Sequence, residues 1–455
     1  MQTLDTNNYI YEVEITSMAN GGAGIGKIDN LAVFVDGAVT GDIVRVKTFS
    51  KNKSFYKAQL LEVIKPSPSR VKPICALHNV CGGCQWQFID YDYQLEAKQN
   101  IVKDCFKKIA GVDFDVKSTV ASPKTTEYRC KIQLPVSQTK NSKRILSGYY
   151  QKGSHELVNI KFCPIQPKII NIITEFIKKR AQELQLSGYA EKTHKGLLRH
   201  FVFRYSLEEN VLVLVFVINA KDILPALKRL AKDTMKEFAQ VKGVLANFNT
   251  DKSNLIMTED FALINGDDFV KEKLSDKIYK ISAGSFFQVN PSTASNIVDF
   301  IKDKVDNVQS LLDVYCGAGA FSIALSGKAQ NITGIEYSKS AIEDAKENLK
   351  LNSVDNVEFL QGDAQVILES LAEQGRSFET AVVDPPRKGC SDETLTTLIK
   401  LVKKQLIYVS CDPSTLARDV KFLLANGFEL KEIQPFDMFP HTYHVETIAI
   451  LNKTN

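Results

Sequence analysis

The pattern of hydrophobic and polar positions changes its character along this chain of 455 residues. Up to about residue 64, short runs alternate apolar with polar residues, as at 11–15, 32–35 and 42–46, and glycine-containing turns separate them. A period of two is typical of half-buried β-strands. We therefore expect residues 1–65 to form a small five-stranded β-barrel of the OB-like type.

The middle of the chain mixes strand and helix patterns. Pro66 and Pro73 predict a linker after the barrel. Helices are expected at 93–110, 168–186 and 223–239, and strands within 128–160 and 200–248. We therefore expect a central α+β domain over residues 66–275.

From about residue 280, apolar strands alternate with amphipathic helices. The strands are expected at 311–315, 332–336, 357–361, 380–383 and 406–409. This alternation predicts an open, mainly parallel, Rossmann-like α/β sheet over residues 276–455. Ligands of such sheets bind beyond the carboxyl ends of the strands. The residues at those ends are Asp313, Glu336, Asp363, Asp384 and Cys411.

Length and composition indicate a globular protein of several domains. A hydrophobic content of 44% and a charged content of 24% are ordinary for that class. No apolar run approaches the roughly 18 residues that span a bilayer, and the first six residues do not resemble a signal peptide. We expect a cytoplasmic protein with no membrane partner. Its nine cysteines are then expected to bind metal, act in catalysis or lie buried rather than form disulfides.

Lysine and arginine are concentrated in two segments, although the net charge is only +4. Residues 47–73 carry seven Lys or Arg and one acid, and residues 98–152 carry twelve Lys or Arg and four acids. Such segments can contact the phosphates of a nucleic acid. They are equally typical of a solvated surface, so charge alone leaves both interpretations open.

A glycine-containing turn ends the first strand of the C-terminal part. Residues 313–319 read Asp-Val-Tyr-Cys-Gly-Ala-Gly, and glycine lets a backbone approach a ligand closely. The phosphate-loop and dinucleotide patterns are absent. Glu336 is placed to accept hydrogen bonds from ribose hydroxyls, and Asp363 to contact an adenine amino group. The spacing resembles class I S-adenosylmethionine-dependent methyltransferases, and a generic nucleotide-fold turn is the alternative.

Cys411 is the candidate nucleophile. It follows the strand expected at 406–409 and precedes Asp412 and Pro413. A thiolate is a strong nucleophile when a base or a lowered pKa activates it. Glu446 is the candidate base. A buried structural thiol and a surface acid are the alternative interpretations of these two residues.

Five motifs in order resemble the RNA uracil-C5 methyltransferase family, and the barrel and the cysteine cluster described below favour its 23S ribosomal RNA branch. They are Phe-Gln-Val-Asn at 287–290, Asp-Val-Tyr-Cys-Gly at 313–317, Asp-Pro-Pro-Arg at 384–387, Ser-Cys-Asp-Pro at 410–413 and His-Val-Glu at 444–446. The N-terminal barrel resembles the TRAM domain of that family. The resemblance covers essentially the whole chain.

The resemblance implies a covalent mechanism. Cys411 would add to C6 of a uracil, C5 would take the methyl group, and Glu446 would remove the C5 proton. The residues implied to line the S-adenosylmethionine site are Gln288, Tyr315, Glu336, Asp363 and Asp384. Phe286 would stack on a uracil flipped out of the RNA. Ala318 and Ala320 depart from the polar residues that some relatives carry, which puts one side-chain contact to the cofactor in doubt.

Four cysteines form a separate candidate site: Cys75, Cys81, Cys84 and Cys163. Their chemistry suits either a [4Fe-4S] cluster or zinc, and four unrelated buried cysteines are the third interpretation. The resemblance to the ribosomal RNA branch implies a [4Fe-4S] cluster that orders the central domain. It also implies that part of residues 92–122 packs on the catalytic domain.

The leading interpretation is therefore an enzyme that methylates C5 of a uridine in 23S rRNA. A tRNA uridine is the runner-up substrate. RNA cytosine-C5 methylation is disfavoured, because Pro386 and Arg387 stand where that class places a cysteine. A non-catalytic iron–sulfur RNA-binding protein is the alternative from another class. We expect a monomer with no DNA partner.

Overall fold

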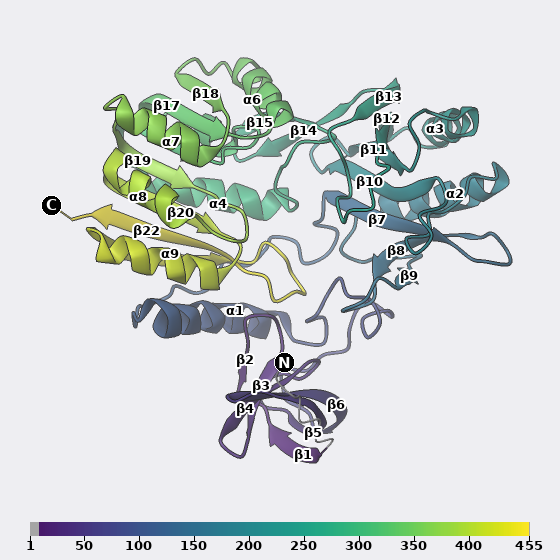
Figure 1. The fold of residues 1–455 in the computed structure, drawn as a ribbon, viewed down its shortest axis with the longest axis horizontal. Helices are drawn as coiled ribbons and strands as arrows, with labels where there is room; N and C mark the ends of the chain where they lie inside the picture. Colours follow the sequence, from purple (N-terminus) through teal and green to yellow (C-terminus); the bar gives the residue numbers. More distant parts are fainter. Residues whose placement is uncertain (1–8, 455) are drawn as a thin grey trace.

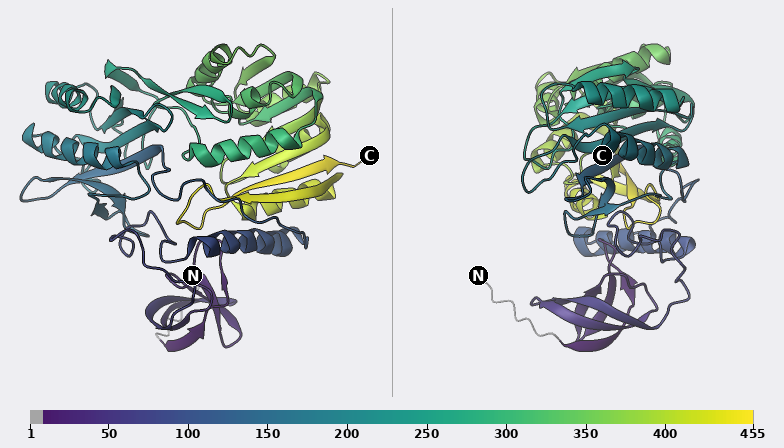
Figure 2. Two further views of the ribbon diagram at one scale, coloured as in Figure 1. Left: turned by 180° about the vertical axis from the view of Figure 1, so that it is seen from behind. Right: turned by 90° about the vertical axis from the view of Figure 1, so that its right-hand side faces the viewer.

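The computed structural model describes residues 9–454, which form three regions in chain order (Figure 1). The N-terminal barrel lies at one end of the molecule, below two sheet-containing regions that stand side by side. The views in Figure 2 show that helix α1 (Tyr91–Cys105) lies between the barrel and the C-terminal region. Among residues 9–454, no helix is long and apolar enough to cross a membrane.

The barrel is a six-stranded sheet in the order β1-β5-β6-β4-β3-β2. Valines and isoleucines at alternating positions fill its interior, as the period-two pattern predicts. The sixth strand, absent from the prediction, is β2, whose two residues are too short to give a periodic signal. The strands are β1 (Ile10–Glu14), β2 (Ser17–Met18), β3 (Gly24–Ile28), β4 (Leu31–Val35), β5 (Ile43–Lys51) and β6 (Phe55–Lys65).

The central region is built on a seven-stranded sheet in the order β13-β12-β11-β10-β7-β8-β9. One face packs on α2 (Lys168–Glu183) and α3 (Pro225–Glu237). The other face shares a hydrophobic core with the C-terminal region. The strands are β7 (Lys131–Gln138), β8 (Ile145–Tyr150), β9 (Leu157–Asn159), β10 (Leu198–Ser206), β11 (Val211–Ile218), β12 (Val241–Phe248) and β13 (Phe261–Gly266).

A two-stranded hairpin joins the central and C-terminal regions. Its strands are β14 (Phe269–Leu274) and β15 (Lys277–Ser282), and the boundary expected between 275 and 276 falls in its turn. The amide of Ser275 in this turn donates to Ser295 Oγ on helix α4 (Pro291–Lys304). The loop from 283 to 290 then leads from the hairpin to that helix.

The C-terminal region confirms the predicted α/β sheet. Its order is β18-β17-β16-β19-β20-β22-β21, and all neighbours are parallel except those of β22. The strands are β16 (Val308–Val314), β17 (Ala329–Glu336), β18 (Val357–Gln361), β19 (Phe378–Val383), β20 (Val402–Ser410), β21 (Phe428–Phe436) and β22 (Glu446–Lys453). The helices are α5 (Ala320–Ala324), α6 (Lys339–Leu351), α7 (Ala364–Glu373), α8 (Asp392–Leu401) and α9 (Pro413–Ala425).

The segment from α1 to residue 120 lies on the C-terminal region. Helix α1 continues into a π-helical turn (Phe106–Ala110) and stops at Gly111, whose φ of 75° is left-handed. The segment expected to be one helix is therefore an α-helix followed by a π-turn. The α1 side chains join the core of the C-terminal sheet, and Val120 forms a parallel bridge with Phe436.

Candidate active site

The antiparallel strand β22 brings Cys411 and Glu446 to the same edge of the sheet. Ser410, the last residue of β20, pairs with Thr447 of β22. Continuing that register by one residue places Cys411 opposite Glu446, although 35 positions separate them in the sequence. Asp384 directly follows the neighbouring parallel strand β19. A thiol and two carboxyls therefore meet at the sheet edge formed by the carboxyl ends of β19 and β20 and the amino end of β22.

The titration of Cys411 and Glu446 is linked. Burial, and to a smaller extent the Glu446 carboxyl, raise the pKa of the Cys411 thiol to about 11. Burial also raises the pKa of Glu446, whose residue is only 3% exposed, and the nearby Asp384 adds to that rise. The Arg387 guanidinium opposes both shifts. Before RNA binds, the thiol is therefore protonated at neutral pH.

Hydrogen bonds within the loop fix the position of Cys411. The amide of Asp412 donates to Ser410 Oγ at 3.2 Å. Asp412 is the N-cap of α9 and accepts from the amide of Ser414 at 2.8 Å. The half-buried Cys411 opens into a pocket of about 90 Å³, which is lined by Asn20, Arg387, Cys411, Asp412, Pro413, Tyr443, His444 and Val445.

The glycine turn after β16 has a left-handed backbone at three positions. Tyr315, Gly317 and Gly319 have φ values of 68°, 55° and 82°. The amide of Gly317 donates to Glu336 Oε2 at 3.0 Å, so the turn is tied to the end of β17. Asp313 is fully buried beneath the turn and accepts from both the amide and the hydroxyl of Ser322. Burial raises the pKa of Asp313 to about 6.

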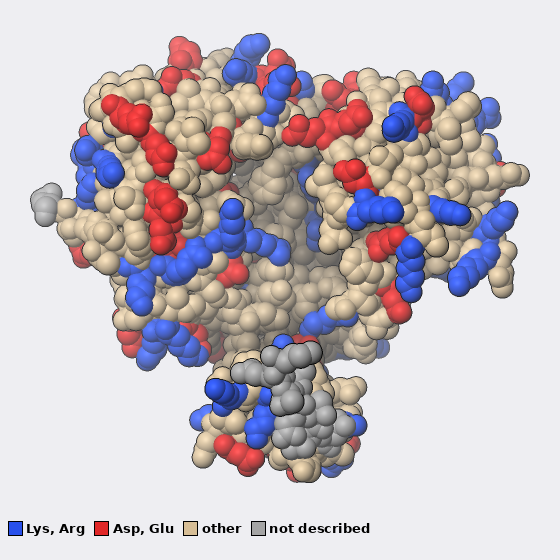
Figure 3. Space-filling model, in the orientation of Figure 1, with Lys and Arg blue, Asp and Glu red and all other residues tan. Residues whose placement is uncertain are grey.

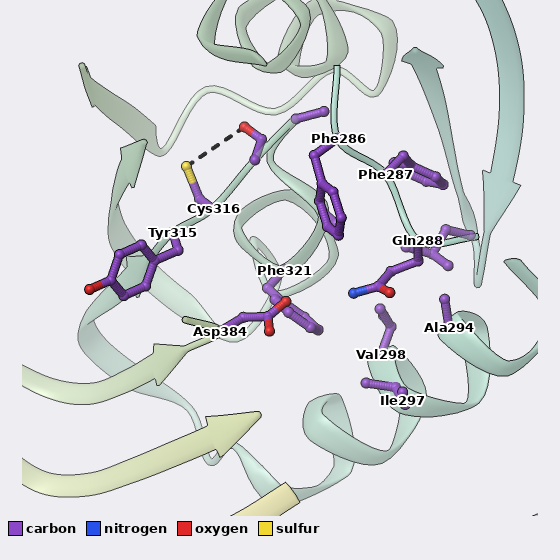
Figure 4. Close-up of a pocket in the computed structure, with 14 residues that line it drawn as sticks. Phe286, Phe287, Gln288, Ala294, Ile297, Val298, Tyr315, Cys316, Phe321 and Asp384 are labelled. Carbon is purple, nitrogen blue, oxygen red and sulfur yellow. Dashed lines mark hydrogen bonds between the residues drawn. The ribbon is translucent and has the colours of Figure 1, made fainter. Parts of the chain in front are cut away.

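A second pocket lies over this turn (Figure 4). Phe286 and Gln288, from the loop before α4, face the backbone of the glycine turn and Asp384 across it. Phe286 is 62% exposed, although large aromatic side chains are mostly buried. The Tyr315 ring points away from Phe286 (Figure 4). Burial, together with the neighbouring Cys390, raises the pKa of the Tyr315 hydroxyl.

Of the residues predicted to line the cofactor site, Gln288, Tyr315 and Asp384 line this pocket, as does Phe286. Glu336 and Asp363 lie outside its lining, at the ends of the next two strands. Both are engaged by backbone amides. Glu336 accepts from Gly317 and Ser338, and Asp363 caps α7 by accepting from Gln365 at 3.0 Å.

The structure adds residues that the sequence did not single out. Arg387 belongs to a recognised motif, but only the fold shows that its charge acts on Cys411 and Glu446. Tyr443 and His444 join the Cys411 pocket with their rings 4.3 Å apart. Asn20 comes from the barrel, and no local signal in the sequence connects it with a cysteine 391 positions later.

The four cysteines expected to bind a cluster lie around one cavity. A space of about 240 Å³ is lined by Cys75, Cys81, Cys84 and Cys163 together with Arg129. Burial, with a smaller contribution from neighbouring thiols, raises the pKa of Cys84 to about 11 and that of Cys163 to about 12. Within residues 9–454, no three His, Cys, Asp or Glu side chains are placed to hold a metal ion.

Comparison with known proteins covers nearly the whole chain. Residues 90–454 match the profile of the tRNA (uracil-5-)-methyltransferase family, and residues 6–61 match the TRAM domain. RNA methyltransferases of Clostridium acetobutylicum and Oceanobacillus iheyensis are each 38% identical over 98% of this chain and 98% and 96% of their own lengths. The crystal structure of Pyrococcus abyssi tRNA (uracil-54, C5)-methyltransferase in complex with S-adenosyl-L-homocysteine matches with a TM-score of 0.76 and 28% identity. That match covers 97% of this chain and 100% of the other.

Proposed function

Because this chain belongs to the tRNA (uracil-5-)-methyltransferase family, we propose that it transfers a methyl group to C5 of a uridine in RNA. The observation that carries the proposal is the meeting of Cys411 and Glu446 at one sheet edge, through the pairing of β20 with β22. A thiol and a carboxyl on neighbouring strands can act on adjacent carbons of one pyrimidine ring.

Cys411 acts as the nucleophile in this proposal. Uracil C5 is a weak nucleophile, and addition of the Cys411 thiolate to C6 converts C4–C5 into an enolate that can attack a methyl group. S-adenosylmethionine supplies that methyl group in activated form. Glu446 then removes the proton from C5, and elimination of the Cys411 thiolate restores the C5–C6 double bond. The carboxylate form of Glu446 is required for the last step.

Residues around the glycine turn would hold the cofactor. Gly317 lines the pocket and leaves room for close approach of a ligand, since a Cβ there would meet nothing nearer than 4.0 Å. Gln288 and Asp384 supply polar groups from opposite sides of the pocket. Glu336, Asp363 and Tyr315 complete the proposed set, with Glu336 already tied to the turn. Phe286, exposed beside the pocket, is proposed to stack on the flipped uracil.

The surface of the molecule suits an RNA ligand. A hollow opens between the C-terminal and central regions, and Lys and Arg side chains lie on both of its sides (Figure 3). The TRAM match places a domain of nucleic-acid-binding type at the end of that hollow. Positive charge beside a hollow attracts the phosphate backbone.

We also propose that the thiol-lined cavity holds a [4Fe-4S] cluster through Cys75, Cys81, Cys84 and Cys163. A single zinc ion needs all four sulfurs about 2.3 Å away. Four thiolates that each bind a different iron stand farther apart, around a larger space. A cavity of about 240 Å³ provides that space.

Elemental analysis of anaerobically purified protein tests the cluster. We expect iron and acid-labile sulfide in equal amounts, about four of each per chain, with broad visible absorption. A Cys84→Ser variant should lose iron while Cys316→Ser, at a buried thiol outside the cavity, keeps it. Colourless protein with stoichiometric zinc would overturn the assignment.

The proposed substrate is a uridine of 23S rRNA, on the resemblance of the barrel and the four cysteines to the ribosomal branch. A tRNA uridine is the second candidate. It is favoured by the likeness to the Pyrococcus abyssi enzyme, which acts on tRNA and matches 97% of this chain, barrel included. The barrel therefore does not by itself choose between the two RNAs.

Mass spectrometry of modified RNA separates these candidates. The protein is incubated with S-adenosylmethionine and, separately, 23S rRNA and tRNA that lack 5-methyluridine. We expect 5-methyluridine in 23S rRNA alone. Signal in tRNA alone would keep the chemistry and replace the substrate, and signal in neither RNA would favour a non-catalytic RNA-binding protein.

A further inference from the structure

A turn of the N-terminal barrel reaches the loop that carries Cys411. The hairpin of β2 and β3 extends from the barrel towards α1 and the loop before β22 (Figure 1). Gly21 and Gly22 close this turn with φ values of 110° and 89°, which favour glycine. At its tip, Asn20 lines the same pocket as Cys411.

The Asn20 side chain is bonded to the first turn of α9. Its amide Nδ2 donates to Ser414 Oγ at 2.7 Å and lies 3.5 Å from Asp412 Oδ1. Asp412 is the residue that follows Cys411 and caps the helix. A side chain of the barrel therefore holds the two polar residues that fix the helical end of the Cys411 loop.

Independent contacts hold the turn in place. The fully buried Trp86 donates its indole N–H to the carbonyl of Gly22 at 3.0 Å. The ring of Tyr443 packs so closely on Gly22 that a Cβ there would lie 2.8 Å from Tyr443 Cδ1. Met18, next to the turn, is buried in the core of the C-terminal region. The turn is thus packed against the C-terminal region, and these contacts hold the backbone of Asn20 in place.

We propose that Asn20 is a positioning residue for the reaction, which holds the Cys411 loop in the geometry that attack on the uracil requires. The proposal rests on the proposed function. Attack requires the sulfur to approach C6 to about 3–3.5 Å in the right direction, and small displacements slow such steps strongly. The barrel then contributes to the chemical step as well as to RNA binding.

Kinetics of Asn20→Ala, Ser414→Ala and the double variant test this proposal. Loss of one neutral hydrogen bond should lower kcat at saturating RNA about fivefold, with the Kd for RNA unchanged. The double variant should be no slower than the slower single variant, because both remove the same bond. Asn52→Ala, on an exposed turn of the same barrel, is the matched control and should keep wild-type kcat.

A second measurement needs no methylation. In the absence of RNA, the rate at which iodoacetamide alkylates Cys411 is measured by peptide mass spectrometry. This rate should change by the same factor in both single variants, and no further in the double variant. If wild-type protein makes no 5-methyluridine but shows this coupling, the proposed function fails and the positioning role stands. A raised Kd for RNA with unchanged kcat, or additive effects in either measurement, would overturn it and make Asn20 at most an RNA contact.

Discussion

At the scale of single residues, the candidate site brings a nucleophile, a buried base and a cation to one edge of the sheet. Burial raises the pKa of both Cys411 and Glu446; Glu446 adds to the rise at Cys411, and Asp384 adds to the rise at Glu446. Arg387 is the cation that lowers both pKa values. Buried acids of like charge do not ionise together readily. Cys411 is therefore a neutral thiol in the resting site, and only the small fraction of molecules in which it is a thiolate can attack the uracil.

This electrostatic arrangement predicts a rate that increases with pH. Because the pKa of Cys411 is raised to about 11, the thiolate fraction grows about tenfold for each pH unit below that value. The raised pKa of Glu446 acts in the same direction, since its carboxylate forms only as the pH rises. Single-turnover methylation should therefore accelerate steadily between about pH 6.5 and 8.5. A rate that is flat over that range would contradict a protonated resting thiol.

Arg387 provides a variant for the same argument. Replacement by Ala removes the positive charge that lowers the pKa of Cys411, so we expect single-turnover methylation at pH 7.5 to fall about tenfold. The pH profile should also shift upwards. Lys388→Ala, an exposed cation at the next position, is the control and should have little effect. Equal losses of methylation rate in the two variants would show that Arg387 contributes only to the overall positive charge of the surface and does not act specifically on Cys411.

At the scale of elements, the sequence located the strand ends that carry the site but not how they meet. Apolar runs placed Asp313, Asp384 and Cys411 correctly, because parallel strands in a buried sheet have a strong hydrophobic signal. The insertion of β22 between β20 and β21 is a long-range pairing without a local signal. The π-turn after α1 was missed for a different reason, because hydrophobic periodicity does not separate π from α turns.

The glycine turn after β16 is the element whose backbone can be tested most directly. A Cβ at Gly319 would lie 2.9 Å from Phe359 Cζ, and the alanine that carries it would have to adopt the left-handed φ of 82°. Gly319→Ala should therefore lower the free energy of unfolding by about 1–3 kcal/mol and weaken cofactor binding. Gly327→Ala, where a Cβ meets nothing within 4 Å, is the control. Urea unfolding and cofactor titration measure both effects, and equal stability of the two variants would refute the strain.

At the scale of the whole molecule, the three regions are joined through buried contacts rather than by flexible linkers. Helix α1, Met18 and Trp86 lie in the core of the C-terminal region, and one face of the central sheet lies in a second shared core. The contact between Asn20 and Ser414 spans 394 positions, so no reading of local patterns could reveal it. Sequence motifs show which residues are present, and tertiary packing decides which of them meet.

A buried ion pair between α1 and the end of β21 tests this coupling. Lys98 and Asp437 both have fully buried side chains. Lys98→Met leaves Asp437 without its cation and should lower the free energy of unfolding by about 3–5 kcal/mol. Lys108→Met removes an exposed pair with Asp104 and should cost less than about 1 kcal/mol. Similar urea midpoints for the two variants would show that α1 is not a structural part of the C-terminal region.

The covalent step is the central claim, and trapping it is the most direct test. RNA transcribed with 5-fluorouridine carries fluorine at C5, so Glu446 has no proton to remove and the adduct cannot resolve. Incubation with S-adenosylmethionine, digestion and mass spectrometry should find a methylated fluorouracil nucleotide on the Cys411 peptide, and none in Cys411→Ala. An adduct on another residue, or methylation of uridine RNA by Cys411→Ala at the wild-type rate, would contradict the account.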